Sequence, residues 1–158
     1  MAGEAVDVSK GARIRAFRRE DIPGVASIGE ESPEAASWTS ENYETLDMSG
    51  GYLALVAETT GSVSGFVISR RMLDEGEILN LAVRRQDRRK GQGRALLSAA
   101  LEQLQRGGVS RVYLEVRESN AAAIAFYQKQ GFSKSGRRPG YYRDPAEAAI
   151  LMEKNLTG

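Results

Sequence analysis

The stretch from residue 77 to residue 104, EILNLAVRRQDRRKGQGRALLSAALEQL, decides the fold of this chain. Its beginning is typical of a buried strand, and its end has the apolar spacing of an amphipathic helix. A turn rich in cations and glycines joins the two. Such a strand–turn–helix unit binds anions, because free backbone N–H groups and the positive end of the helix dipole meet at the helix N-terminus.

The turn at residues 88–94 has the composition of a diphosphate-binding loop. Glycine at positions 91 and 93 lets phosphate oxygens approach the backbone N–H groups, because no Cβ atom stands in the way. The pattern matches neither GxxxxGK[ST] nor GxGxxG, so those two nucleotide-binding motifs lose their support. A surface loop with solvated arginines stays open as an alternative at this point. The residues expected to hold the diphosphate are Arg88, Arg89, Lys90, Gly91, Gln92, Gly93 and Arg94.

Length and charge favour one globular domain with a local anion site. The chain has 158 residues, 41% of them hydrophobic and 27% charged, with a net charge of only +1. We expect a disordered lead-in over residues 1–10 and a single domain over residues 11–158. Six cations and one acid lie between residues 84 and 94, and residues 134–143 hold a second basic group. Basic patches on a nearly neutral body favour a small anionic ligand over general coating of nucleic acid.

The absence of cysteine and histidine restricts the chemistry. It excludes a cysteine acyl-enzyme, a histidine base, disulfides and Cys/His metal sites, and we expect no metal. Carboxylate, tyrosine and lysine remain for proton transfer. No apolar run approaches the length of a membrane span, and the N-terminus lacks an apolar signal core, so we expect a cytoplasmic location.

The order of the predicted elements is β-α-α-β-β-β-α-β-α-β-β. This order favours an α/β fold of the α+β type, with a mixed central sheet flanked by helices. We find no internal repeat and no second core. Strands are expected at residues 12–18, 52–58, 63–70, 77–83 and 111–117 and twice within 132–154, and helices at 20–31, from Thr39 onward, from the loop to 106, and at 119–130.

A second constellation lies at residues 114–127, LEVRESNAAAIAFY. On a helix, Asn120 and Tyr127 share one face, while Glu115 stands mid-strand among apolar neighbours, where a carboxylate needs a reason to be present. Taken singly, each has an ordinary explanation: an N-cap for Asn120, a core aromatic for Tyr127, and an ion-pair partner for Glu115. Together, behind a diphosphate-binding loop, they indicate a reaction site.

The segments EILNLAV, RxxGxGRALL, LEVRxSNAAAIAFYxxxGF and GYY…AILM together resemble the ribosomal-protein-alanine N-acetyltransferases, the Rim group of the GCN5-related N-acetyltransferase superfamily. The likeness is dense over residues 77–152 and loose before them, where Trp38-Thr39 is similar to a Trp-Ser in the family's substrate loop. It implies the acetyltransferase fold and acetyl-coenzyme A (acetyl-CoA) as co-substrate. It also implies that the acceptor is the N-terminal alanine of a ribosomal protein. Because the chain has no cysteine or histidine, we expect direct transfer in a ternary complex rather than through a covalent intermediate.

The resemblance also implies roles for the second constellation. Glu115 would remove a proton from the α-amine, whose pKa of about 8 already leaves part of it neutral. Tyr127 would protonate the departing thiolate. Asn120 would reach the pantetheine or adenylate side. Glu77 is a rival base, although we expect its position at the start of a strand to leave it exposed to solvent.

The remaining implied contacts concern the two substrates. Leu81, Ala82 and Val83 would line the pantetheine arm, and residues 88–94 would hold the pyrophosphate. The peptide would enter between Trp38 and the pair Tyr141-Tyr142, although ordinary hairpin packing explains that pair almost as well. The substrate-binding residues are therefore expected to be Trp38, Tyr141 and Tyr142.

Two kinds of alternative remain. The acceptor could instead be another protein N-terminus, a lysine or a small amine. The chain could also be a non-catalytic coenzyme A sensor or a ribosome- or RNA-associated protein. Glu115 and Tyr127 argue against a sensor, and the lack of aromatic residues among the basic residues 84–94 argues against single-stranded RNA. We expect no direct contact with nucleic acid or membrane, and a monomer or weak dimer.

Overall fold

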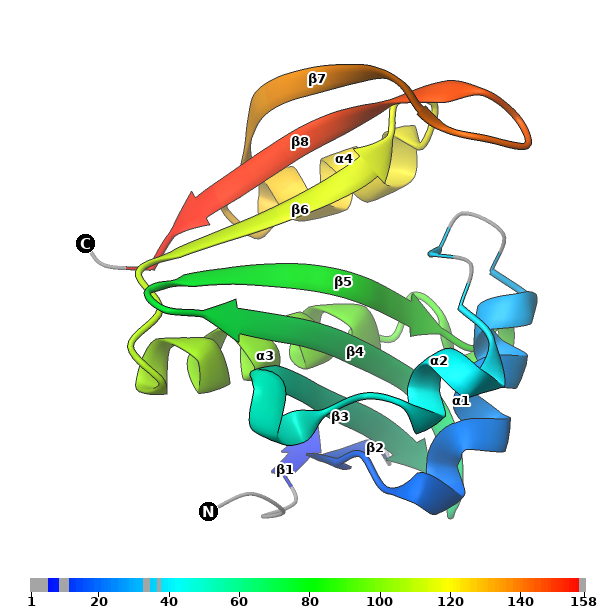
Figure 1. Cartoon of the computed structure of the whole chain (residues 1–158). Coiled ribbons are helices and arrows are strands. Elements are labelled where there is room, and N and C mark those ends of the chain that lie inside the picture. Colours follow the sequence, from blue (N-terminus) through cyan, green and yellow to red (C-terminus); the bar gives the residue numbers. More distant parts are fainter. Residues whose placement is uncertain (1–5, 9–11, 33–34, 37, 157–158) are drawn as a thin grey trace.

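The computed structural model describes residues 6–8, 12–32, 35–36 and 38–156, and its centre is one eight-stranded sheet (Figure 1). The strand order is β1-β2-β3-β4-β5-β6-β8-β7. Neighbouring strands are antiparallel except for β5 and β6, which are parallel. The strands are β1 (Val6–Val8), β2 (Ala12–Ala16), β3 (Tyr52–Thr59), β4 (Ser62–Met72), β5 (Glu75–Val83), β6 (Arg111–Arg117), β7 (Ser133–Tyr142) and β8 (Glu147–Asn155).

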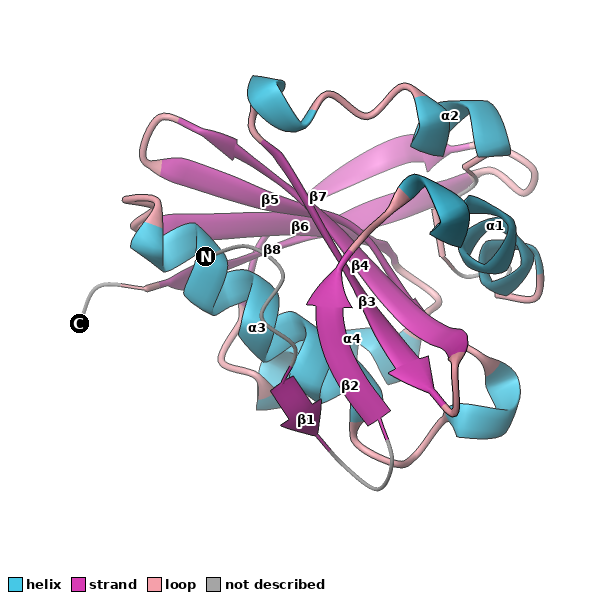
Figure 2. Ribbon diagram, turned by 90° about the horizontal axis from the view of Figure 1, so that it is seen from below, coloured by secondary structure: helices cyan, strands magenta, loops and turns pink. Residues whose placement is uncertain are grey.

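Helices cover both faces of the sheet (Figure 2). On one face, α1 and α2 bury Val25 and Tyr43 against Phe66 and other residues of β3 and β4. On the other, α3 packs Leu97 and its apolar neighbours against β4 to β6, and α4 lies beside it. In the part of the chain described, no helix is long and apolar enough to span a membrane. The helices are α1 (Ile22–Glu30), α2 (Ser40–Glu44), α3 (Gln92–Arg106) and α4 (Ala121–Lys129), with short 3-10 turns at η1 (Arg19–Asp21), η2 (Met48–Gly50) and η3 (Arg85–Asp87).

The predicted order of elements is confirmed, with one addition and several shifted ends. Val6–Val8, inside the segment expected to be disordered, forms β1 and pairs with β2; the other residues of that segment lie outside the described residues. The helix expected at 20–31 begins as the turn η1, and Pro23 stands in the first turn of α1. Thr39 caps α2 as predicted, because its side chain accepts a hydrogen bond from the N–H of Asn42.

The two parallel strands β5 and β6 separate soon after they meet. They pair only at Glu75–Arg111, Gly76–Val112 and Glu77–Tyr113, although both strands continue beyond these pairs. From residue 78 onward, β5 therefore has no strand partner on the β6 side. Figure 1 shows the two strands diverging. Unpaired backbone groups at such a divergence are available to an extended ligand.

Candidate active site

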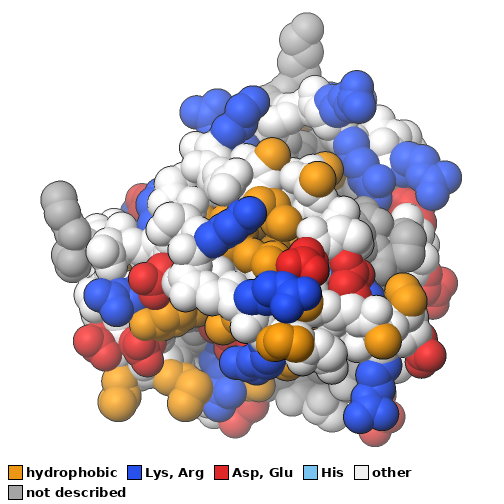
Figure 3. All heavy atoms as spheres, turned by 90° about the horizontal axis from the view of Figure 1, so that it is seen from above, with side chains coloured by type: hydrophobic (Ala, Val, Ile, Leu, Met, Phe, Trp, Pro, Cys, Tyr) orange, Lys and Arg blue, Asp and Glu red, His pale blue; other side chains and the backbone are white. Residues whose placement is uncertain are grey.

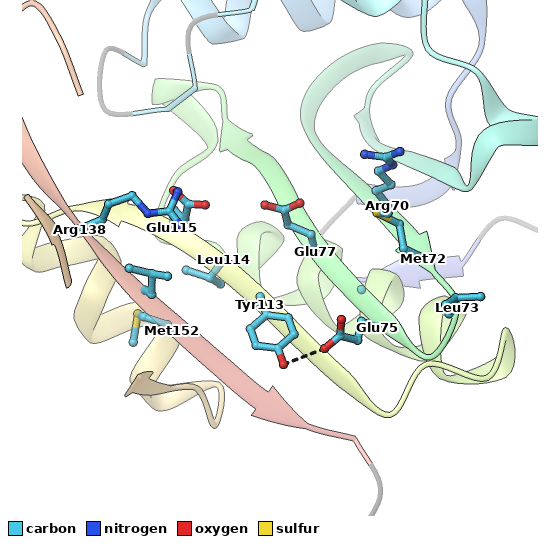
Figure 4. Close-up of a pocket in the computed structure, with 12 residues that line it drawn as sticks. Arg70, Met72, Leu73, Glu75, Glu77, Tyr113, Leu114, Glu115, Arg138 and Met152 are labelled. Carbon is cyan, nitrogen blue, oxygen red and sulfur yellow. Dashed lines mark hydrogen bonds and ion pairs between the residues drawn. The ribbon is translucent and has the colours of Figure 1, made fainter. Parts of the chain in front are cut away.

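A cavity of about 450 Å³ lies where β5 and β6 begin to separate, on the face opposite α3 (Figure 4). We call it the β5–β6 cavity. Its charged and polar lining residues are Arg70, Glu75, Glu77, Tyr113, Glu115 and Arg138. Its other lining residues are Met72, Leu73, Gly76, Leu114, Leu151 and Met152.

Glu115 enters the cavity from the middle of β6. Its neighbours Leu114 and Val116 are buried toward α3, so strand alternation turns Glu115 to the opposite face. Its Oε2 atom is buried and accepts no hydrogen bond from the described residues. Arg138 forms a long ion pair with Glu115, with 3.9 Å between Nη1 and Oε2. The carboxylate thus keeps an acceptor position that an amine can fill.

Glu77 also lines this cavity, and the expectation that it would be exposed to solvent was wrong. The reason is that β6 pairs with β5 up to Glu77 and encloses its side chain. Burial, and then the negative charge of Glu115, raise the pKa of Glu77, while Arg70 and Arg138 oppose the rise. Among the described residues it has no hydrogen-bond or ion-pair partner. Figure 4 shows both carboxylates pointing into the cavity from adjacent strands.

Tyr127 lies in α4 and Asn120 directly precedes this helix, on the other face of the sheet. The ring of Tyr127 contacts Phe126 and Phe132 edge-on, with centroids 5.1 and 5.6 Å away. Burial raises the pKa of its hydroxyl, so the group stays protonated at neutral pH. Asn120 caps α4, its side-chain oxygen accepting a hydrogen bond from the N–H of Ala123 at 3.0 Å. Glu115 and Tyr127 therefore approach the β5–β6 separation from opposite faces.

The predicted diphosphate loop opens α3. Gly91 is the N-cap residue with φ +81°, and none of the described residues supplies a side-chain cap. The N–H groups of the first helical turn consequently lack intrahelical partners, as a bound anion requires. Arg89, Lys90 and Arg94 are exposed around this end. An added Cβ at Gly91 would have no atom within 4 Å, so the space in front of the loop is open.

Two residues assigned to this loop face inward instead. Arg88 donates from Nε to the carbonyl of Val83 at 2.9 Å and from Nη2 to the hydroxyl of Ser32 at 2.8 Å. Gln92 is buried; its Oε1 accepts from the Ser64 hydroxyl at 2.7 Å, and its Nε2 donates to Thr59. Both side chains fix the loop to the sheet. This leaves the exposed cations and the backbone to meet an anion.

The residues expected along the pantetheine arm lie on the unpaired part of β5. Leu81 and Val83 are half-buried and pack against the core under α3, whereas Ala82 faces the side of α1 and α2. On the other edge, these residues pair with Val67, Phe66 and Gly65 of β4. The edge toward β6 carries no strand, although the Val83 carbonyl already accepts from Arg88.

The aromatic residues expected to contact the peptide form two separate groups. Trp38 packs on Tyr43 with ring centroids 5.2 Å apart. Tyr141 and Tyr142 contact one another at 5.0 Å, and Arg138 and Arg117 lie over their rings. Burial and the charge of Glu115 raise the pKa of Tyr142 to about 12, so the charge of Glu115 reaches the end of β7. No ring contact joins the two groups in the described part of the chain.

On the one face that Figure 3 shows, the basic side chains are spread out rather than joined into one strip. On the face shown in Figure 3 they lie in small groups around a hollow with hydrophobic side chains at its centre. Acidic side chains stand between them. Arg137, one member of the second basic group, is paired with Glu118 through contacts of 2.6 and 3.0 Å.

Comparison with known proteins shows which family the chain resembles. A model of the acetyltransferase (GNAT) family matches residues 15–132. The ribosomal protein bS18-alanine N-acetyltransferase of Escherichia coli strain K12 is 36% identical over 141 residues, or 88% of this chain and 94% of the relative. The crystal structure of Ard1 from Thermoplasma volcanium has a TM-score of 0.85 at 32% identity, covering 94% of this chain and 100% of the other. The PaiA N-acetyltransferase of Thermoplasma acidophilum, solved with coenzyme A, shares the fold with a TM-score of 0.77 at 20% identity, covering 92% of this chain and 99% of the other.

Proposed function

Because the chain belongs to the acetyltransferase (GNAT) family, we propose that it transfers the acetyl group of acetyl-CoA to the α-amine of a protein N-terminus. The observation that carries the proposal is the arrangement around the β5–β6 separation. Two carboxylates, Glu77 and Glu115, lie on one face of the sheet, and the buried Oε2 atom of Glu115 accepts no hydrogen bond from the described residues. An uncapped helix end with exposed cations lies beside the other face.

Acetyl-CoA would supply the activated acetyl thioester. The open space at Gly91 and the free N–H groups of the first turn of α3 fit its pyrophosphate, with Arg89, Lys90 and Arg94 as counter-charges. The unpaired edge of β5 at residues 81–83 would bind the pantetheine arm, and Asn120 would stand beside it at the start of α4. The inward contacts of Arg88 and Gln92 would hold the loop in shape rather than touch the phosphates.

Glu115 and Tyr127 would then carry the protons. Glu115 takes a proton from the α-ammonium group, and the neutral amine attacks the thioester carbonyl carbon. The N–C bond forms as the C–S bond breaks, and the leaving thiolate takes a proton from the Tyr127 hydroxyl. The attacking nitrogen loses its second proton as the amide forms, and this proton, passed through solvent, restores the Tyr127 hydroxyl. Because burial raises its pKa, the Tyr127 hydroxyl is protonated at neutral pH and can donate a hydrogen bond to the sulfur as negative charge develops there. Glu77 would help bind the ammonium by its charge.

We propose the N-terminal alanine of a ribosomal protein as the acceptor, as in the name of the Escherichia coli relative. Such an acceptor implies a cytoplasmic enzyme. Tyr141, exposed to 44% of its surface, and Tyr142 would contact the peptide next to Glu115. Trp38, packed on α2, would border the path from the other side.

The test is thiol release from acetyl-CoA by the full chain in the presence of an alanine-started peptide. Glu115→Gln keeps the size of the side chain but removes the base, so turnover should fall by roughly 10²–10⁴-fold. Glu102→Gln, on the exposed face of α3, is the matched control and should keep wild-type turnover. Equal turnover in the Glu115→Gln enzyme would overturn the assignment of the base.

A further inference from the structure

The β5–β6 cavity is much larger than an alanine acceptor needs. Its volume of about 450 Å³ falls among pockets of roughly 300–1,000 Å³ that hold whole small ligands. The side chain of alanine is one methyl group, close in size to a water molecule, whose share of liquid volume is roughly 30 Å³. A site restricted to alanine by steric exclusion would fill this space with protein atoms.

The first side chain of the acceptor must lie close to its amine. The α-nitrogen and Cβ are bonded to the same Cα atom, so a cavity that holds the amine at Glu115 also holds the start of the side chain. Glu77 and Glu115 are two of the charged groups that line the cavity, and the buried Oε2 atom of Glu115 accepts no hydrogen bond from the described residues. A cationic amine is the group that relieves two such carboxylates.

Beyond the carboxylates the lining becomes apolar. Leu151 stands directly opposite Glu115 in the β6–β8 ladder and lines the cavity beside it. At the open end the β4–β5 turn presents Met72 and Leu73, exposed to 58% and 92% of their surfaces. Leu73 has φ +58°, a backbone conformation that leucine rarely adopts, at the rim of the cavity. Long apolar side chains reaching out from the amine would bury these surfaces.

We propose that this cavity receives the side chain of the acceptor's first residue and admits methionine and leucine as well as alanine. The inference rests on the proposed α-amine acetylation and extends it to N-termini that keep their initiator methionine. An unbranched, flexible methionine side chain adapts to an irregular apolar space of this kind. Contact with Met72 and Leu151 compensates for the entropy lost when that side chain is ordered.

The first test uses peptides that differ only in their first residue: alanine, methionine or leucine. Acetylation of the α-amine is followed by mass spectrometry, and kcat/KM is measured for each peptide. Methionine and leucine peptides should fall within about tenfold of the alanine peptide. Values more than about 200-fold below it would overturn the inference while leaving the proposed function intact. If no peptide is acetylated on its α-amine, the proposed function itself fails.

The second test fills the cavity from two sides. Leu151→Trp reduces the space next to Glu115, and Met72→Trp reduces it at the exposed rim, where folding is little affected. Each should lower the ratio of methionine to alanine activity by roughly 10-fold or more. Met48→Trp, an exposed methionine outside the cavity, is the control and should leave the ratio unchanged. An unchanged ratio in folded Leu151→Trp and Met72→Trp enzymes would contradict the proposal.

Discussion

Replacement of Gly93 by alanine should separate the stability of the fold from the binding of coenzyme A. Gly93 lies in the first turn of α3, and the nearest side-chain atoms to an added Cβ would belong to Val83 and Phe126, at 3.8 Å or more. These are ordinary van der Waals distances, so the fold tolerates the methyl group. Alanine is also favoured over glycine in a helix by up to about 1 kcal/mol. We expect the melting temperature to stay or to rise by roughly 2–4 °C.

The same methyl group would stand between β5 and α4, where the pantetheine and pyrophosphate are proposed to run. Losing one hydrogen bond between a backbone N–H and a charged phosphate costs about 1.5–3 kcal/mol. The dissociation constant for coenzyme A should therefore rise roughly 10- to 150-fold, as measured by isothermal titration calorimetry. Unchanged affinity in a fully folded Gly93→Ala protein would refute the loop as the diphosphate site.

Gly91→Ala is the informative companion variant. No atom lies within 4 Å of an added Cβ at this position, so the methyl group meets no obstacle. The φ of +81° is the difficulty, since an L-residue in that conformation costs about 1–2 kcal/mol. Thermal unfolding should therefore show a loss of roughly 2–8 °C in Gly91→Ala, against none in Gly93→Ala.

Three further perturbations test other parts of the account. Glu77→Gln should raise stability at neutral pH, because it removes a half-buried charge whose pKa is raised. As the pH falls, the Glu77 carboxylate of the wild type becomes protonated in the native state before it does in the unfolded state. The difference in unfolding free energy between Glu77→Gln and wild type should therefore shrink in acid, and a difference that stays constant with pH in urea titrations would contradict this. Tyr127→Phe should lower single-turnover rates by roughly 10²–10⁴-fold with coenzyme A affinity kept; an undiminished rate would remove Tyr127 as the acid. Arg15→Met should cost about 3–5 kcal/mol, because it leaves the carboxylate of Asp21, only 5% exposed, without its guanidinium; a calorimetric loss below about 1 kcal/mol would show that other groups compensate.

Much of the fold follows from local pattern. The strand at residues 111–117 and the helix that ends at Arg106 have the predicted bounds, because alternation and helical spacing are strong there and glycines follow the helix. The hairpin around Gly61 is likewise local, since a turn with positive φ at residues 60 and 61 needs no distant partner. The strand β1 was missed because three residues gain their order only by pairing with β2.

The candidate site depends on partners far away in the sequence. Arg88 turns toward Ser32 and Gln92 toward Ser64, residues that no local pattern places beside the loop. The enclosure of Glu77 depends on its parallel pairing with Tyr113, 36 residues later in the chain. The sequence did contain a signal for the cavity, because Glu77 and Glu115 both lie in predicted strands, where the alternation of side chains assigns each carboxylate to one face of the sheet. The point at which β5 and β6 separate could not be predicted from the sequence of either strand alone, because it depends on how the two strands pair.

The most direct test of the central claim is the position of the acetyl group on a single peptide that offers two amines. A peptide with an alanine N-terminus and an internal lysine is incubated with acetyl-CoA and the full chain, and the product is fragmented in a mass spectrometer. The account predicts acetyl on the α-amine of alanine, and its loss with Glu115→Gln. Acetyl on the lysine alone would contradict the account.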